Sequence, residues 1–176
     1  MQTSIQSLAV VVEKLERHKI GYTLGGSGLL CSLGLADKVG DWDVMTEAPK
    51  GDVLAALQDF EVKEITSGDY PFASEYKLIV RSTSPQVEIM GRFSIYCGAG
   101  LCHIPSIPLA RWNGIQIGSP EAWYVAYALM NRKEKADMLL AHLKQTGFRE
   151  PIVRQLMREP LPDDIRRQLD SLLQGS

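Results

Sequence analysis

The sequence predicts an α+β fold, in which a mixed sheet flanked by helices is followed by a helical segment. Up to residue 118, short apolar and β-branched runs alternate with apolar stripes at helical spacing. From Ser119 onward the patterns are helical only. Ser119-Pro120-Glu121 marks this change, because it joins a capping hydroxyl, a first-turn proline and an acid near the positive end of the helix dipole. We expect an α+β core over residues 1–118 and a helical region over residues 119–176 packed on it.

The composition is typical of a soluble globular chain. Its 176 residues, 45% of them hydrophobic, are enough for a core without disulfides or a structural metal. The formal net charge of -2 lacks the basic excess of a protein that coats nucleic acid, so a nucleic-acid partner is expected less than a small one. Three irregularly spaced cysteines form no disulfide framework, and no signal sequence or membrane-spanning run is visible. We therefore expect a cytoplasmic protein with no membrane partner.

Helices and strands alternate in the first half of the chain. The first helix is expected to be capped by Thr3 or Ser4 and stopped by Gly21. Further helices are predicted over residues 27–35 and 49–57, and strands over residues 22–24, 41–45, 61–65, 75–81 and 86–90. A polar loop over residues 66–71 and a turn over residues 82–85 separate the later strands. Short strands and loops follow, and Asn113-Gly114 is the strongest hairpin signal in the chain.

The second part of the chain carries helix signals at both ends of each predicted element. One helical region is expected to run from Ser119 to about Thr146, where Gly147 stops it. Pro151 and Pro162 then begin two further short helices. Strands and helices are thus mixed first, and helices alone follow.

A glycine-rich stretch, Gly25-Gly26-Ser27, follows the strand predicted at residues 22–24. Where a strand enters a helix through glycines, free backbone amide groups and here the Ser27 hydroxyl point toward the space in front of the turn. Phosphate is the ligand that suits such a turn best. The stretch lacks the further glycine of a Rossmann fingerprint and the Gly-Lys-Ser/Thr ending of a Walker loop. By itself the stretch is a weak signal, because glycine pairs mark many tight strand-to-helix turns with no ligand.

Asp41 and Asp43 lie two residues apart in a predicted strand. Residues with this spacing point to the same face, so both carboxylates could bind one ion or an adjacent pair. Carboxylate oxygens suit magnesium or manganese. The alternative is a solvated strand face or an aspartate-rich turn.

Glu88 lies between two apolar neighbours, Val87 and Ile89, in another predicted strand. If that strand is adjacent to the one with Asp41 and Asp43, three carboxylates converge. Such a cluster repels itself unless cations neutralise it, so its presence implies metal. Two divalent ions at such a cluster could clamp the attacking and leaving oxygens of a phosphoryl displacement.

The order of these motifs resembles the nucleotidyltransferase superfamily typified by DNA polymerase beta, including its small aminoglycoside-type, lincosamide-type and antitoxin-type members. The resemblance covers about half of the chain, from Tyr22 to Met90. It implies a nucleotidyltransferase-like mixed sheet, and it assigns a role to each motif residue. The implied triphosphate-binding residues are Gly25, Gly26 and Ser27, and the implied metal-binding and catalytic residues are Asp41, Asp43 and Glu88. The sequence departs from the family pattern in a slightly long spacer before Asp41 and in a glutamate where an aspartate is common as the third acid.

The resemblance implies transfer of a nucleoside monophosphate from a nucleoside triphosphate, with ATP as the expected nucleotide, to an acceptor hydroxyl. Pyrophosphate is released, and Mg²⁺ or Mn²⁺ is the expected cofactor. The expected acceptor is small, and its identity stays open, as does a second copy or another protein as partner. Two alternatives remain: a weak or inactive nucleotide-binding regulator of the same fold, and a structural α+β domain whose acids form a solvated strand face.

Several other side chains are noted without an assigned role. The cations that could reach a triphosphate or simply face solvent are Lys77, Arg132, Lys133 and Lys135. Cys97, Cys102 and His103 suggest a soft-metal site but lack a fourth ligand, so buried thiols and a loop histidine are expected. Trp112, Trp123 and Tyr127 are expected in the core rather than stacked on a base.

Overall fold

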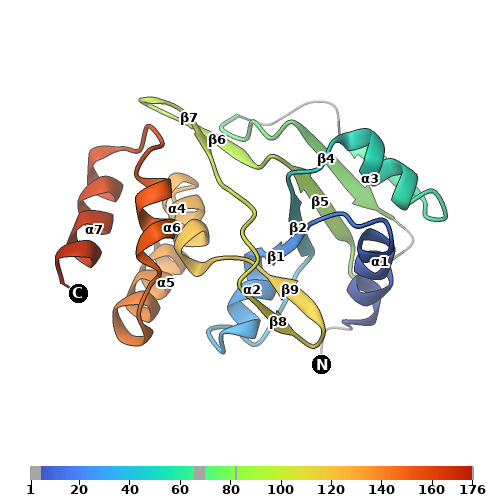
Figure 1. Ribbon diagram of the computed structural model, residues 1–176, viewed down its shortest axis with the longest axis horizontal. Helices are drawn as coiled ribbons and strands as arrows, with labels where there is room; N and C mark the ends of the chain where they lie inside the picture. The colour runs from blue at the N-terminus through green and yellow to red at the C-terminus, as the bar shows by residue number, and fades with distance from the viewer. Residues whose placement is uncertain (1–4, 66–69, 82, 176) are drawn as a thin grey trace. The chain divides into compact units, whose positions relative to one another are not determined.

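The computed structural model describes residues 5–65, 70–81 and 83–175, and these residues form two compact units (Figure 1). The first, here called the sheet unit, takes the described residues of 1–68, 74–93 and 105–118. The second, the helical unit, takes those of 69–73, 94–104 and 119–176. The predicted α+β class, with a mixed sheet flanked by helices and a helical segment after it, is confirmed. The expected domain boundary at residues 118 and 119 stays a prediction.

The sheet unit is built on a sheet that has seven strands in the described residues. The strands are β1 (Thr23–Gly25), β2 (Trp42–Thr46), β3 (Val62–Ile65), β4 (Tyr76–Val80), β5 (Val87–Gly91), β8 (Ala110–Trp112) and β9 (Ile115–Ile117), in the order β3-β4-β5-β2-β1-β9-β8. β2 runs parallel to β5 and antiparallel to β1. The strands that carry the glycine turn, the two aspartates and Glu88 are therefore neighbours in the middle of the sheet.

The core of the sheet unit lies on one face of the sheet, under the helices α1 (Gln6–Arg17) and α3 (Lys50–Ala56). The apolar stripe of α1 is fully buried there through Leu8, Val11 and Leu15, because its residues recur at helical spacing. A third helix, α2 (Gly26–Ser32), follows β1 directly. α1 ends before the predicted stop at Gly21, since Lys19 takes the left-handed conformation at φ 55° and allows the turn that glycine was expected to make.

Alternation along the strands decides which side chains face this core. Trp42 and Val44 of β2, and Val87 and Ile89 of β5, all belong to the buried cluster under α1 and α3. Successive side chains of a strand point to opposite faces, so residues 43 and 88 project from the other face of the sheet. Burial of four large apolar side chains, each worth about 1.5–3 kcal/mol, makes a register slip by one residue very costly.

The helical unit combines a two-stranded hairpin with four helices in the described residues. Its elements are β6 (Ser94–Cys97), β7 (Gly100–His103), α4 (Pro120–Leu129), α5 (Lys133–Thr146), α6 (Glu150–Leu156) and α7 (Asp163–Gln174). The predicted cap of α4 is present, because the Ser119 hydroxyl accepts a hydrogen bond from the Ala122 amide at 3.1 Å. Gly147 ends α5 at φ 98°, as predicted.

The structure corrects the single helical region predicted between residue 119 and Thr146. The chain leaves helical geometry after Leu129, and Asn131 takes the left-handed conformation at φ 58°. A new helix then begins at Lys133. Asparagine tolerates this conformation better than most residues, which explains why a sequence without glycine at this point still turns.

The remaining predictions divide into three groups. The hairpin signal at Asn113-Gly114 is confirmed, because both residues have positive φ, 52° and 81°, between the paired strands β8 and β9. The predicted caps Thr3 and Ser4 and most of the loop over residues 66–71 lie outside the described residues. Across the described stretches, every helix is too short or too polar to cross a bilayer.

Candidate active site

Asp43 and Glu88 are direct neighbours on the polar face of the sheet. β2 and β5 pair in parallel with Asp43 opposite Glu88, between the core pairs Trp42–Val87 and Val44–Ile89. The two carboxyl groups are close enough for the charge of Glu88 to raise the pKa of Asp43. From the sequence alone, a shared site depends on whether the strand of Glu88 is adjacent to the strand of Asp43. In the sheet these two strands, β5 and β2, are neighbours.

This arrangement raises the pKa of Asp43 to about 7, from an ordinary value near 3.8. Burial is the largest cause, because it disfavours the charged carboxylate. The negative charges of Glu88 and Asp41 raise the pKa further, and the positive charge of Lys77 opposes them. Near neutral pH the pair therefore holds a proton about half of the time, and a cation placed between the carboxyl groups could replace that proton.

Lys77 is the one cation among the noted candidates that the structure pairs with the acids. It lies on β4, two residues before Ile79, which is opposite Glu88 in the antiparallel pair β4–β5. Side chains two apart share a face, so Lys77 is diagonal to Glu88. Its Nζ atom lies 3.3 Å from Glu88 Oε2. The Glu88 side chain is only 17% exposed, which makes this contact stronger than a typical surface ion pair.

The glycine turn lies against Asp43. In the antiparallel pair β1–β2, Gly25 is opposite Asp43. Gly26 follows with φ 56°, a conformation that favours glycine, and a Cβ added to it would collide with the carboxylate oxygen Oδ2 of Asp43. Ser27 comes next, in the first turn of α2. The backbone of Gly26 thus approaches the acid pair more closely than any residue with a side chain could.

Among the three acids, Asp41 has the weakest structural connection to the site. It is exposed and precedes β2, and its charge is close enough to raise the pKa of Asp43. In the part of the chain that the structure describes, no three or more His, Cys, Asp and Glu side chains are placed as a ready ligand set for a metal ion. The donors nevertheless fit a divalent cation chemically, because all are carboxylate oxygens and the Asp43–Glu88 pair already needs a positive partner. Asp41, Asp43 and Glu88 are the residues that would hold it.

A cavity of about 570 Å³ lies elsewhere in the sheet unit, away from the acid pair. Its lining includes Gly21 and Tyr22, which precede β1, and Glu47, which follows β2. Because β1 and β2 are antiparallel with Gly25 opposite Asp43, this cavity is at the opposite end of the strand pair from the glycine turn. The carboxyl pair, with its perturbed pKa, is the better guide to chemistry, since the cavity is lined mainly by exposed residues.

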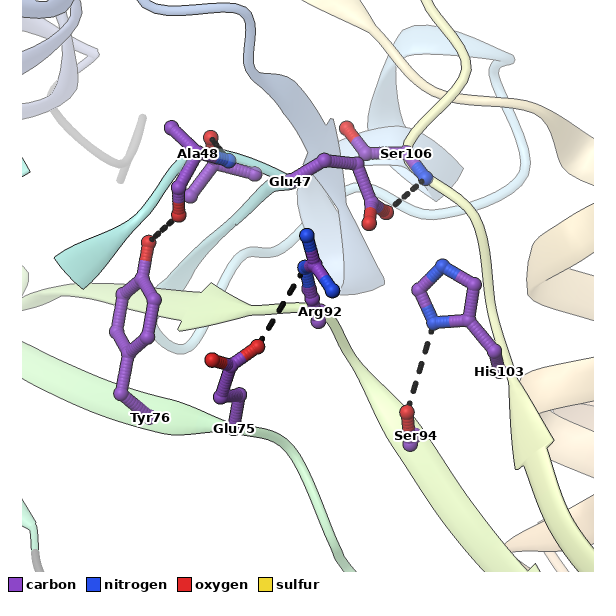
Figure 2. A network of polar contacts seen from close by, with 9 residues as sticks. Glu47, Ala48, Glu75, Tyr76, Arg92, Ser94, His103 and Ser106 are labelled. Atoms are coloured by element: carbon purple, nitrogen blue, oxygen red, sulfur yellow. Dashed lines mark hydrogen bonds and ion pairs between the residues drawn. The ribbon is translucent and has the colours of Figure 1, made fainter.

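The end of the strand pair beside the cavity is held by a polar network that the sequence did not single out (Figure 2). The Ser106 amide donates to Glu47 Oε1 at 3.0 Å, and the Ser106 hydroxyl donates to the Met45 carbonyl at 3.2 Å. The Tyr76 hydroxyl donates to the Ala48 carbonyl at 2.5 Å. Burial, together with nearby acids, raises the pKa of Tyr76 to about 12. No local signal could have predicted these contacts, because they join segments far apart in the sequence.

Of the other noted side chains, Trp112 is partly buried against the core of the sheet unit, and the rest lie in the helical unit. Trp123 and Tyr127 are buried on α4 with ring centroids 5.4 Å apart, as expected for core aromatics. The Lys135 ammonium lies 5.4 Å from the Tyr127 ring centroid, a cation–π arrangement. His103 lies in strand β7 rather than in the predicted loop. Cys102 is buried and Cys97 is half-buried.

Comparison with known proteins gives a result at the level of the fold. No family model matches the chain, and no curated protein matches it. Solved structures do match. A candidate nucleotidyltransferase of Thermotoga maritima superposes with a TM-score of 0.57 and 24% identity, over 80% of this chain and 92% of that one.

Two structures of ANT(2'')-Ia match over nearly the whole chain. The complex of ANT(2'')-Ia with adenylyl-2''-tobramycin has a TM-score of 0.59 and 11% identity, and covers 98% of this chain and 99% of that one. The solution structure of this antibiotic-resistance factor has a TM-score of 0.59 and 13% identity, over 99% and 96%. At these identities the likeness shows the fold, so the chain has a nucleotidyltransferase-like fold.

Proposed function

We propose that this chain is a metal-dependent nucleotidyltransferase that transfers a nucleoside monophosphate from a nucleoside triphosphate to an acceptor hydroxyl. One observation carries the proposal: Asp43 lies opposite Glu88 beside the glycine turn, and burial together with the negative charges of Glu88 and Asp41 raises the pKa of Asp43 to about 7. Buried like charges are costly in a structural role, and they become useful when a cation binds. The nucleotidyltransferase-like fold supports the same reaction class.

The acids of this chain would hold the metal. Magnesium bound by Asp41, Asp43 and Glu88 would supply charge neutralisation at the phosphate and at the attacking oxygen. Because its pKa is raised, Asp43 would have to lose its proton to hold the metal, which would make metal binding depend on pH. Lys77 holds one oxygen of Glu88 at 3.3 Å, so it sets the direction in which the other oxygen can act. Glu88 then either remains a ligand or accepts the proton of the attacking hydroxyl.

The glycine turn would receive the phosphates. Gly25 and Gly26 bring the backbone against Asp43, and the Ser27 hydroxyl follows directly, so donors for phosphate oxygens lie next to the acids. In the transfer, the acceptor oxygen forms a bond to the α-phosphorus and the bond to the bridging oxygen breaks. Pyrophosphate leaves, and the hydroxyl proton passes to Glu88 or to solvent. The residues of this chain contribute mainly position and charge, as phosphoryl transfer requires.

A small hydroxyl-bearing molecule is the acceptor class that we propose, with ATP as the nucleotide. The complex of ANT(2'')-Ia contains an adenylylated antibiotic, adenylyl-2''-tobramycin, and that protein matches this chain over nearly its full length. The acidic balance of this chain, with a net charge of -2, also favours a cationic or neutral small acceptor over a long nucleic acid.

A nucleotide-binding regulator of the same fold is the second candidate, and one contact favours it. Lys77 already neutralises part of the charge on Glu88, and the three acids are not placed as a ready ligand set among the described residues. A site arranged in this way could bind nucleotide without turnover. The two candidates separate cleanly, because only the enzyme releases pyrophosphate.

The test is a pyrophosphate-release screen with each nucleoside triphosphate, magnesium or manganese, and a panel of aminoglycosides and other small polyols. The control variants are Asp43→Ala and Asp37→Ala, since Asp37 is an exposed acid in the loop before β2. We expect turnover that Asp43→Ala abolishes and Asp37→Ala preserves. Nucleotide binding without turnover on any acceptor would support the regulator, and full activity of Asp43→Ala would refute the proposed mechanism.

A further inference from the structure

The β6–β7 hairpin of the helical unit places two thiols side by side. Cys97 is opposite Gly100, and Cys102 is opposite Ile95, in an antiparallel pair. Opposite residues share a face and residues two apart share it as well, so Cys97 and Cys102 are diagonal neighbours on one face of the hairpin. Their Sγ atoms lie 3.2 Å apart. A disulfide has sulfurs about 2 Å apart, so the two sulfurs must approach each other by about 1 Å for the bond to form.

The surroundings of the two thiols differ. Cys102 is fully buried, whereas Cys97 is half-buried. Burial and the neighbouring Cys97 raise the pKa of Cys102 to about 12, which keeps that thiol protonated. Cys97 is therefore the thiol that an external reagent reaches first, and Cys102 is placed to act as the resolving thiol. The third cysteine, Cys31, lies in the sheet unit and takes no part in this pair.

Both thiols also donate toward a single carbonyl. The Pro160 oxygen lies 2.9 Å from Cys97 Sγ and 3.5 Å from Cys102 Sγ. The segment between α6 and α7, which contains Pro160, is thus tied to the hairpin by thiol hydrogens. A second tie runs from the His103 amide to Glu159 Oε1 at 3.0 Å. Loss of the thiol hydrogens would remove the first tie and leave the second.

We propose that Cys97 and Cys102 are a reversible oxidation site, which closes to an intramolecular disulfide by exchange with a small-molecule disulfide. The Cys97 thiolate attacks one sulfur of the reagent, the other leaves as a thiol, and a mixed disulfide forms at Cys97. Cys102 then loses its proton and attacks the Cys97 sulfur, which expels the second reagent thiol. Two protein thiols and one reagent disulfide become one protein disulfide and two reagent thiols, so electrons and protons balance.

Closure has a structural consequence within the helical unit. The oxidised pair has no S–H donor for the Pro160 carbonyl, so the hairpin loses these two hydrogen bonds to the segment between α6 and α7. The hydrogen bond between His103 and Glu159 remains. Oxidation is expected to loosen this segment while the pairing of β6 with β7 stays intact, because the new bond links the two strands themselves.

A glutathione redox titration of the folded chain tests the proposal, in a Cys31→Ser background that leaves only the pair. Samples are equilibrated over a range of oxidised-to-reduced ratios, alkylated and digested with trypsin. Arg92 and Arg111 bound a peptide that contains both Cys97 and Cys102 and no other cleavage site. We expect this peptide to lose two hydrogens, to resist alkylation and to recover both thiols on reduction. The folded chain should reach half-oxidation at a ratio about tenfold more reducing than the chain in urea, because folding positions the sulfurs.

Two single variants keep the test decisive. Cys97→Ser should form no mixed disulfide at the pair, whereas Cys102→Ser should stop at a stable glutathione adduct on Cys97. Cys102 is buried, so circular dichroism must show that this variant folds; Cys97→Ser carries the comparison if it does not. The proposal is overturned if wild-type chain retains two alkylatable thiols at the most oxidising ratio, if the adduct on Cys97 persists without closing, or if the folded and unfolded chains oxidise at the same ratio.

Discussion

Asp43 and Glu88 lie opposite each other in the parallel pair β2–β5, and the charge of Glu88 raises the pKa of Asp43. Two acids in such contact cannot both ionise cheaply, so the pair stores an electrostatic cost that a proton or a metal ion relieves. That relationship links the fold to the proposed chemistry. It also yields effects that can be measured without knowing the acceptor.

Replacement of Asp43 by asparagine should stabilise the metal-free chain at high pH. The folded-state pKa of Asp43 is about 7, above its ordinary value near 3.8. The folded chain therefore binds more protons between these values, and its stability falls as pH rises through that window. Relative to wild type, Asp43→Asn should gain on the order of 2 kcal/mol at pH 8, an effect limited by the partial exposure of the side chain. It should gain little at pH 4, where Asp43 is protonated in the folded chain.

Urea unfolding at pH 4, 6 and 8 in the presence of a chelator measures this difference. Magnesium should stabilise wild type at pH 8 and leave Asp43→Asn unchanged. A stability difference that does not vary with pH would contradict the raised pKa of Asp43.

Alanine at Gly26 should destabilise the chain by about 1–3 kcal/mol and weaken nucleotide binding. The positive φ is strained for any other residue, and the added Cβ would collide with Asp43 Oδ2. Gly40→Ala is the matched control, since no described atom lies within 4 Å of a Cβ built there and its backbone is not left-handed. Thermal unfolding of both variants provides the comparison, and equal effects would mean that the glycine turn tolerates a side chain.

Methionine in place of Lys77 should raise the pKa of Asp43 further. The charge of Lys77 lowers this pKa in the wild-type chain, and its ammonium contacts Glu88. Methionine keeps most of the side-chain volume while it removes the charge. Lys50→Met serves as control, because Lys50 pairs with Glu64 on the surface instead. Carbon NMR of the Asp43 carboxyl group follows the titration directly, and an unchanged midpoint in Lys77→Met would show that Lys77 does not act on the pair.

Loss of the Ser119 hydroxyl should cost about 1–2 kcal/mol of stability. This hydroxyl caps α4 through the Ala122 amide and donates to Glu121 Oε2 at 2.7 Å. Glu121 is buried and its other oxygen accepts from the Arg149 amide at 3.0 Å, so Ser119→Ala leaves a buried acid short of one partner. Ser171→Ala, at an exposed position on α7, should have almost no effect. Urea unfolding of both variants measures the difference, and a neutral Ser119→Ala would show that water replaces the cap.

The sequence allowed much of the fold to be predicted because its local signals are strong. Period-two alternation around Asp43 and Glu88 was enough to predict that both acids leave the core face. The capping hydroxyl of Ser119 and the Asn113-Gly114 turn were visible for the same reason, since each acts over a few residues. The break at Asn131 was missed, because asparagine in the left-handed conformation is only one of several local outcomes.

The sequence by itself determined which side chains could form a site: Asp41, Asp43 and Glu88 as acids, and Gly25, Gly26 and Ser27 as a close backbone approach. Only the tertiary structure decided that Glu88 meets Asp43, that Lys77 joins them, and that Cys97 meets Cys102. Strand alternation is a local property of a few residues, whereas strand order depends on burial summed over the whole sheet. The raised pKa of Asp43 is likewise a result of the tertiary structure, because it depends on the pairing of β2 with β5.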